Sequence, residues 1–82
     1  MPDPTTFVEP VADIRKSTDE EIRVTIEETR RGKTRVKVRE WFRSEGELRP
    51  GRDGIALRPD LLDQIIAALT AANLKIRGRG AL

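Results

Sequence analysis

The chain has no cysteine and no histidine, and these two absences exclude several classes of protein. Without cysteine it has no disulfide framework, no thiol nucleophile and no thiolate metal site, which fits a reducing compartment. Without histidine it also lacks the usual zinc ligands and the commonest acid–base catalyst. Asp60 and Asp63 are better explained as acidic residues in the first turns of a helix than as a catalytic pair. We therefore expect no metal, no cofactor and no enzymatic activity.

Long apolar runs are also absent. No segment is long and apolar enough to span a membrane, and the first residues lack the basic flank and apolar stretch of a secretory signal. We expect no membrane association, and a location in the cytoplasm near the nucleoid if the source is bacterial, or in the nucleus if it is eukaryotic.

A chain of 82 residues forms one small domain with a small core, and dimerisation is an ordinary way to stabilise such a domain.

Charge is distributed unevenly along the chain. Residues 1–29 carry three basic and eight acidic side chains, whereas residues 30–58 carry ten basic and four acidic ones. Residues 59–82 carry three basic and two acidic side chains, which completes the net charge of +2. A cationic middle third is typical of a local surface for an anionic partner, although a solvated surface of a soluble protein also accounts for charge alone.

The pattern of apolar residues predicts an α+β domain over residues 21–74, with four antiparallel strands followed by one helix. Alternating apolar residues indicate strands at 22–27 and 33–42, and two short strands are expected at 47–49, before Pro50-Gly51, and at 55–57. Gly32 is expected to take positive φ in the first turn, Arg43-Ser44-Glu45-Gly46 forms the next, and Pro50-Gly51 is expected to separate the two short strands.

Both ends of the chain are expected to lie outside the folded domain. Residues 1–20 contain three prolines and only isolated apolar residues, so we expect a flexible tail that cannot bury enough surface to offset its ordering entropy. The helix is expected from Pro59 to about Ala72, and residues 75–82 are expected to form a basic tail.

The helix has a wide apolar face. Its large apolar residues recur at helical spacing and are Leu61, Leu62, Ile65, Ile66 and Leu69. Packing on the sheet of the same chain would explain them. Because the domain is so small, we expect part of this face to form the interface of a homodimer.

The most informative pattern lies between residues 33 and 43, where every second residue is basic or aromatic. These residues are Lys33, Arg35, Lys37, Arg39, Trp41 and Arg43, with Val36, Val38 and Phe42 among the residues between them. In a strand, alternate side chains point to opposite faces, so the cations and Trp41 would share one surface above the valines. A bulge near the strand end would exchange Trp41 and Phe42, and the sequence leaves this open.

A cationic strand that carries an aromatic residue is typical of surfaces that bind single-stranded nucleic acid, where phosphates meet cations and unpaired bases stack. The candidate contact residues are Arg30, Arg31, Lys33, Arg35, Lys37, Arg39, Trp41, Phe42, Arg43, Arg49 and Arg52. The alternative is that Arg35 or Lys37 only pairs with Glu27 or Glu47 across the sheet. Double-helix motifs are absent, so single strands are the more natural ligand.

The segment from Arg39 to Leu57 resembles a known family. Val38-Arg39-Glu40-Trp41-Phe42, then Glu45-Gly46-Glu47-Leu48-Arg49-Pro50-Gly51-Arg52, then Gly54-Ile55-Ala56-Leu57 and Pro59 are similar to the C-terminal domain of transcriptional coactivator positive cofactor 4. The resemblance spans roughly residues 21–74. It implies a curved, four-stranded antiparallel sheet with a C-terminal helix, in a homodimer that binds single-stranded DNA with little sequence preference.

The resemblance also implies residue roles. Lys33, Arg39, Arg49 and Arg52 would contact the DNA backbone, and Phe42, beside Trp41, takes the place of a base-stacking tryptophan. Arg30 stands near a second stacking position of the family, Asp53 replaces a common basic residue, and Arg58 replaces the usual asparagine helix cap. The missing serine-rich region favours a bacterial or phage member.

The function that we expect is therefore single-stranded DNA binding in transcription regulation, replication or repair. RNA, melted duplex, and RNA polymerase or other transcription proteins are the further partners to be considered. An interaction module that docks on an acidic protein partner is the competing interpretation of the same basic surface.

Overall fold

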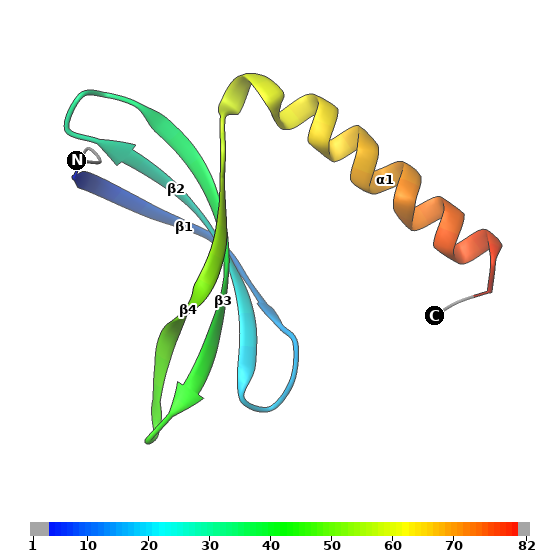
Figure 1. Cartoon of the computed structure of the whole chain (residues 1–82), viewed down its shortest axis with the longest axis horizontal. Coiled ribbons are helices and arrows are strands. Elements are labelled where there is room, and N and C mark those ends of the chain that lie inside the picture. Colours follow the sequence, from blue (N-terminus) through cyan, green and yellow to red (C-terminus); the bar gives the residue numbers. More distant parts are fainter. Residues whose placement is uncertain (1–3, 81–82) are drawn as a thin grey trace.

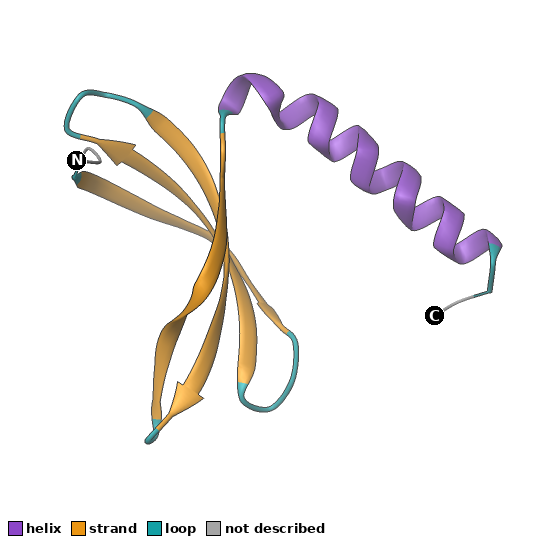
Figure 2. Cartoon of the chain, in the orientation of Figure 1, coloured by secondary structure: helices purple, strands orange, loops and turns teal. Residues whose placement is uncertain are grey.

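An antiparallel sheet and one C-terminal helix make up the structure, a computed structural model that describes residues 4–80 (Figures 1 and 2). The strands are β1 (Thr5–Arg15), β2 (Glu20–Thr29), β3 (Thr34–Ser44) and β4 (Glu47–Leu57), and they lie side by side in that order. A 3-10 turn at Pro59–Leu61 leads into α1 (Leu62–Gly78). The predicted architecture, four antiparallel strands followed by one helix, is confirmed, but the strands are not the four that the sequence pattern indicated.

The two hairpin turns on either side of β3 follow the predicted chemistry. Gly32 takes φ of 79° between β2 and β3, and Glu45 and Gly46 take φ of 53° and 81° between β3 and β4. Two consecutive residues with positive φ form the kind of turn whose twist matches that of the flanking strands.

The prediction of a flexible tail over residues 1–20 is wrong for residues 5–15, which form β1. This strand pairs antiparallel with β2 along its length, with a bulge between Pro10 and Ala12. The tail was predicted from its prolines and its lack of a buried face, and β1 is indeed largely exposed. An edge strand, however, tolerates proline, and it gains backbone hydrogen bonds without burying much apolar surface.

The predicted third and fourth strands are one continuous strand, β4. Pro50-Gly51 is therefore part of an irregularity inside a strand, and the prediction that it forms a turn was wrong. In the register, Arg39 lies opposite Gly54 and Trp41 opposite Pro50, so a single residue of β3 faces three of β4. A Cβ atom at Gly51 would lie 2.8 Å from the backbone oxygen of Glu40, which explains why glycine suits this position.

Helix α1 is longer than predicted and continues to Gly78, so residues 75–78 are helical and do not belong to a tail. Arg58 precedes the first helical turn and makes no side-chain cap; its guanidinium instead donates hydrogen bonds to both carboxylate oxygens of Asp60. This contact lowers the pKa of Asp60. In the described chain, no helix is long and apolar enough to cross a membrane.

One chain alone does not enclose a hydrophobic core. Helix α1 projects away from the sheet, and across residues 4–80 no side chain is fully buried (Figure 1). The radius of gyration is 15.1 Å, compared with about 12 Å for a compact chain of this length. Apolar residues of the helix and of one sheet face are consequently left half-buried or exposed, including Leu69 at 65% and Ile55 at 60% exposure.

Replacement of Gly51 by alanine should destabilise the protein by about 1–3 kcal/mol, because the new methyl group would overlap the carbonyl of Glu40. Urea unfolding at one fixed protein concentration measures the change. Gly78→Ala is the matched control: a Cβ atom there meets nothing within 4 Å, and alanine in a helix should stabilise by up to about 1 kcal/mol. Equal stability of wild type and Gly51→Ala would contradict the close approach.

Candidate nucleic-acid interface

The pairing of β2 with β3 gives the sheet two faces of different chemistry. It runs without interruption from Glu20 opposite Phe42 to Glu28 opposite Thr34, so facing side chains alternate regularly. One side, here called the charged face, carries Arg23, Thr25, Glu27, Arg35, Lys37, Arg39 and Trp41. The other, the apolar face, carries Ile22, Val24, Ile26, Val36, Val38, Ile55 and Leu57.

The structure places Trp41 on the charged face and Phe42 on the apolar face. Trp41 lies opposite Glu21 and Phe42 opposite Glu20, so the regular alternation of β3 continues to the end of the strand. The bulge that could have exchanged them lies in β4, where it leaves the side-chain direction of β3 unchanged. Phe42 is 42% exposed and pairs across the sheet with Arg49. The two aromatic residues thus belong to different surfaces.

A hollow of about 380 Å³ lies on the charged face. All four strands contribute to its lining: Val8 from β1, Arg23, Thr25 and Glu27 from β2, Lys37, Arg39 and Trp41 from β3, and Pro50 from β4. This volume is at the lower end of the range of about 300–1,000 Å³ that is usual for small-molecule sites. Cations and apolar groups surround the same hollow, which is the combination that an unpaired nucleotide requires.

Arg23 covers one side of the Trp41 ring, although the sequence pattern did not indicate it as a site residue. Its guanidinium carbon lies 4.2 Å from the ring centroid, within the distance of a cation–π contact. Glu21 Oε1 lies 3.2 Å from Arg23 Nη2, and Asp13 Oδ1 lies 3.6 Å from Arg23 Nε. Arg23 Nε is buried and has no hydrogen-bond partner among the described residues. Arg23 lies directly opposite Arg39 of β3 in the strand register, and the sequence alone does not determine this register.

Lys37 and Arg39 each make a polar contact that orients the side chain. Lys37 Nζ lies 3.3 Å from Glu27 Oε1, which is the cross-strand ion pair considered as an alternative to nucleic-acid contact. Arg39 Nη1 donates a hydrogen bond to the Gly51 carbonyl at 3.2 Å, beside the β4 bulge. Partly exposed ion pairs contribute only about 0–1 kcal/mol, so a phosphate can compete with Glu27 for Lys37.

The other predicted contact residues are spread around the sheet. Arg30, Arg31 and Lys33 are exposed in the loop between β2 and β3. Arg35 lies on the charged face, opposite Glu27. Arg49, by contrast, lies on the side of Phe42, and Arg52 belongs to the bulge of β4. The structure therefore brings Arg35, Lys37, Arg39 and Trp41 together and separates them from Phe42 and Arg49.

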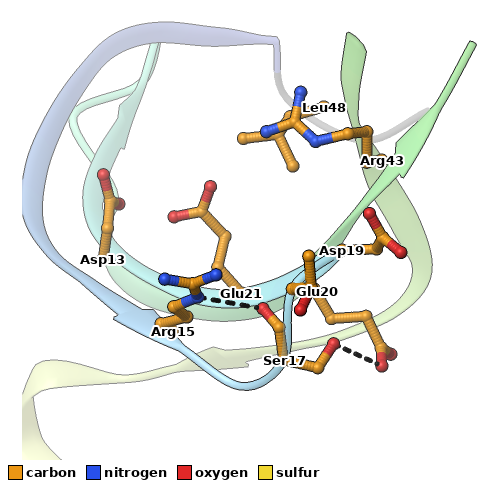
Figure 3. A pocket seen from close by; sticks show the side chains of 9 residues that line it. Asp13, Arg15, Ser17, Asp19, Glu20, Glu21, Arg43 and Leu48 are labelled. Carbon is orange, nitrogen blue, oxygen red and sulfur yellow. Dashed lines mark hydrogen bonds between the residues drawn. The ribbon is translucent and has the colours of Figure 1, made fainter. Parts of the chain in front are cut away.

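Arg43 lies in an acidic environment at the end of the sheet where the β1–β2 loop meets the β3–β4 hairpin. It lines a second hollow, of about 370 Å³, in which it and Leu48 lie across from Asp13 and Glu21, with Asp19 beside Arg43 (Figure 3). Arg43 Nη1 donates a hydrogen bond to the carbonyl of Gly46. These carboxylates disfavour phosphate here, so Arg43 is a weaker candidate for DNA contact than Lys37 or Arg39.

The β1–β2 loop is fastened to β3 by Lys16. Its ammonium lies 2.7 Å from Glu40 Oε1 and 3.7 Å from Glu20 Oε2. The hydrogen bond to Glu40, reinforced by the charge of Glu20, raises the pKa of Lys16. Lys16 is therefore paired with carboxylates and lies outside the cationic part of the charged face.

The fold and the charged face define a class of small proteins in which a curved antiparallel sheet with a cationic surface is followed by a single helix. Residues 11–68 match the family described as transcriptional coactivator p15 (PC4), and the chain belongs to this family. The resemblance predicted from the sequence is thereby confirmed. The family binds nucleic acid and is not enzymatic, so membership implies a DNA-binding, coactivator-like function.

Solved structures agree with this assignment. The chain is similar to BPSL1147, a PC4 homologue from Burkholderia pseudomallei, in two crystal forms. The match to the tetragonal form has 35% sequence identity and a TM-score of 0.71, and it covers 82% of this chain and 98% of the BPSL1147 chain. The match to the orthorhombic form has 34% identity and a TM-score of 0.72, and it covers 89% of this chain and 95% of the BPSL1147 chain. No curated protein sequence gives a significant match.

Replacement of Arg23 by glutamine should uncover the Trp41 ring and remove the cation–π contact. We expect stronger acrylamide quenching of tryptophan fluorescence and a loss of about 0.5–1 kcal/mol in the free energy of unfolding. Arg35→Gln, which removes the same charge from the same face, is the control and should leave the quenching unchanged. Identical quenching in all three proteins would show that Arg23 does not cover the ring in solution.

Proposed function

We propose that the protein is a homodimer that binds single-stranded DNA with little sequence preference and acts in transcription regulation, replication or repair. Phosphates lie along the cations of the charged face, and unpaired bases stack beside Trp41. The bacterial source of the similar structures supports a place near the nucleoid in the cytoplasm, with RNA polymerase or other transcription proteins as further partners.

One observation carries this proposal: Lys37, Arg39 and Trp41 line the same hollow on the charged face. Cations attract the phosphate backbone without regard to sequence, and each base that stacks on an aromatic side chain contributes about 1–3 kcal/mol. Both kinds of group are needed together, because cations alone would bind any polyanion. Arg23 adds a guanidinium plane next to the ring, and arginine itself stacks on bases.

Single strands fit this surface better than a duplex does. A base can enter the hollow only if its edge and its faces are unpaired and unstacked, a condition that a double helix does not meet without base extrusion. Helix α1 offers no alternative, since its large residues are apolar and basic residues enter only in its last turn.

A dimer is supported by the apolar surface that one chain leaves open. The predicted interface residues Leu61, Ile66 and Leu69 are exposed, and Leu62 and Ile65 are only half-buried. The apolar face of the sheet is also incompletely covered, with its central residues half-buried and Ile55 at 60% exposure. Two copies could cover both surfaces at once, if the helix of each packs on the apolar groups of the other. The charged faces would then remain free for DNA.

The proposal predicts binding that favours single strands and weakens steeply with salt. Anisotropy of a labelled single strand and of the matching duplex, measured over a series of salt concentrations, tests both points. A site that neutralises about four phosphates should give a slope near −3 in a plot of log affinity against log salt. Equal affinity for single strand and duplex would contradict the proposal. Tighter binding to RNA of the same sequence would show that RNA, and not DNA, is the preferred ligand.

Substitution of Trp41 by alanine should weaken single-strand binding about tenfold, since a stacking surface is lost. Phe42→Ala is the comparison, because Phe42 lies next in sequence but on the opposite face of the sheet. A smaller loss for Phe42→Ala supports stacking at Trp41. A larger loss would move the stacking site to the surface that Phe42 shares with Arg49.

The paired substitution of Ile65 and Leu69 by aspartate should convert the dimer into monomers. Burial of two carboxylates in an apolar interface is strongly unfavourable, so association should fail. Size-exclusion chromatography with light scattering measures the mass, which is 9.3 kDa for one chain. Gln64→Asp, on the opposite side of the helix, is the control and should remain dimeric. A wild-type protein that is monomeric at high concentration would contradict this part of the proposal.

A further inference from the structure

Glu27 is out of place in a surface that binds phosphates. It lies among the cations of the charged face, lines the hollow beside Trp41, and is only 17% exposed. A carboxylate there repels the DNA backbone, and its ion pair with Lys37 contributes little by itself. A role toward the base of the nucleotide would explain why an acceptor stands at this position.

The two oxygens of the carboxylate have different surroundings. Oε1 is engaged by Lys37 Nζ at 3.3 Å and by the Thr5 hydroxyl at 3.4 Å. Oε2 accepts a hydrogen bond from the Thr25 hydroxyl at 3.2 Å, and a carboxylate oxygen can accept a second one. Thr25 and Lys37 thus fix the orientation of the carboxylate, and both also line the hollow.

We propose that the hollow holds one unpaired base and that Glu27 selects bases that present an amino group. The inference rests on the proposed single-strand binding. Carboxylates accept hydrogen bonds from the N4 amino group of cytosine, whereas uracil and thymine present a carbonyl oxygen at that position. Val8, Trp41 and Pro50 offer the base an apolar surface, and Lys37 and Arg39 hold the flanking phosphates. The site therefore gives a modest preference for cytosine over thymine or uracil within a broadly unspecific channel.

Competition between two homopolymers isolates this contact. Oligo(dC) and oligo(dU) of equal length have the same backbone and the same ring size, and they differ only at ring positions 3 and 4. In slightly alkaline buffer, where cytosine is unprotonated, wild-type protein should bind oligo(dC) about fivefold more tightly than oligo(dU), a difference of about 1 kcal/mol. This value is at the lower end for a base contact, because Glu27 is also ion-paired with Lys37.

The variant Glu27→Gln should abolish the preference, because an amide presents both a donor and an acceptor to either base. Its affinity for both oligonucleotides should rise, since a negative charge is lost beside the phosphates. Glu28→Gln is the matched control: the neighbouring residue loses the same charge, but its side chain lies on the other face. This variant should keep the fivefold ratio. Thermal unfolding of all three proteins checks that the fold is retained.

The possible outcomes separate this inference from the proposed function. Measurable binding of both oligonucleotides with equal affinity overturns the base selection and leaves single-strand binding intact. A preference that persists in Glu27→Gln overturns the role of Glu27. Failure to bind either oligonucleotide at low salt overturns the proposed function itself.

Discussion

The unbroken pairing of β2 with β3 is the constraint on which the other features depend. Because side chains alternate with a period of two, a slip of one residue in this register would move every cation to the apolar side and every valine to the charged side. The register therefore determines which face of the sheet carries the cations and which face carries the apolar side chains that must be buried. It also stacks Arg23 on Trp41, two residues that are far apart in sequence.

The structure divides its tasks between surfaces that do not compete. The charged face is complete within one chain, since all four strands contribute to its hollow. The apolar face and helix α1, in contrast, are not buried within one chain. The helix extends away from the sheet, and the described residues enclose no buried core (Figure 1). Stability and the proposed DNA binding are thus separable. Stability depends on what covers the apolar groups, and the proposed binding depends on the cations and Trp41.

The sequence predicted an antiparallel sheet followed by one helix, the two hairpin turns and the strand that carries the cations, because these depend on local alternation and on glycine conformation. The count of four strands agreed only because one strand was missed and another was split. It did not predict β1, whose prolines and exposed residues resemble a disordered segment and whose order comes from pairing with β2. It split β4 at Pro50-Gly51, since a bulge and a turn use the same residues. The contacts of Arg23 and Glu27 could not be predicted from the sequence either, because they depend on the cross-strand register.

The irregularities in β1 and β4 have a consequence for how copies of the protein can meet. Both are edge strands, and each carries a proline beside a bulge, at Pro10 in one and at Pro50 in the other. A proline cannot donate a hydrogen bond, and a bulge breaks the straight row of backbone groups that a further strand would need. Both margins of the sheet are consequently poor templates for a further strand at these points. Association of two copies through their faces is thereby favoured over edge-to-edge stacking of the sheets into a filament.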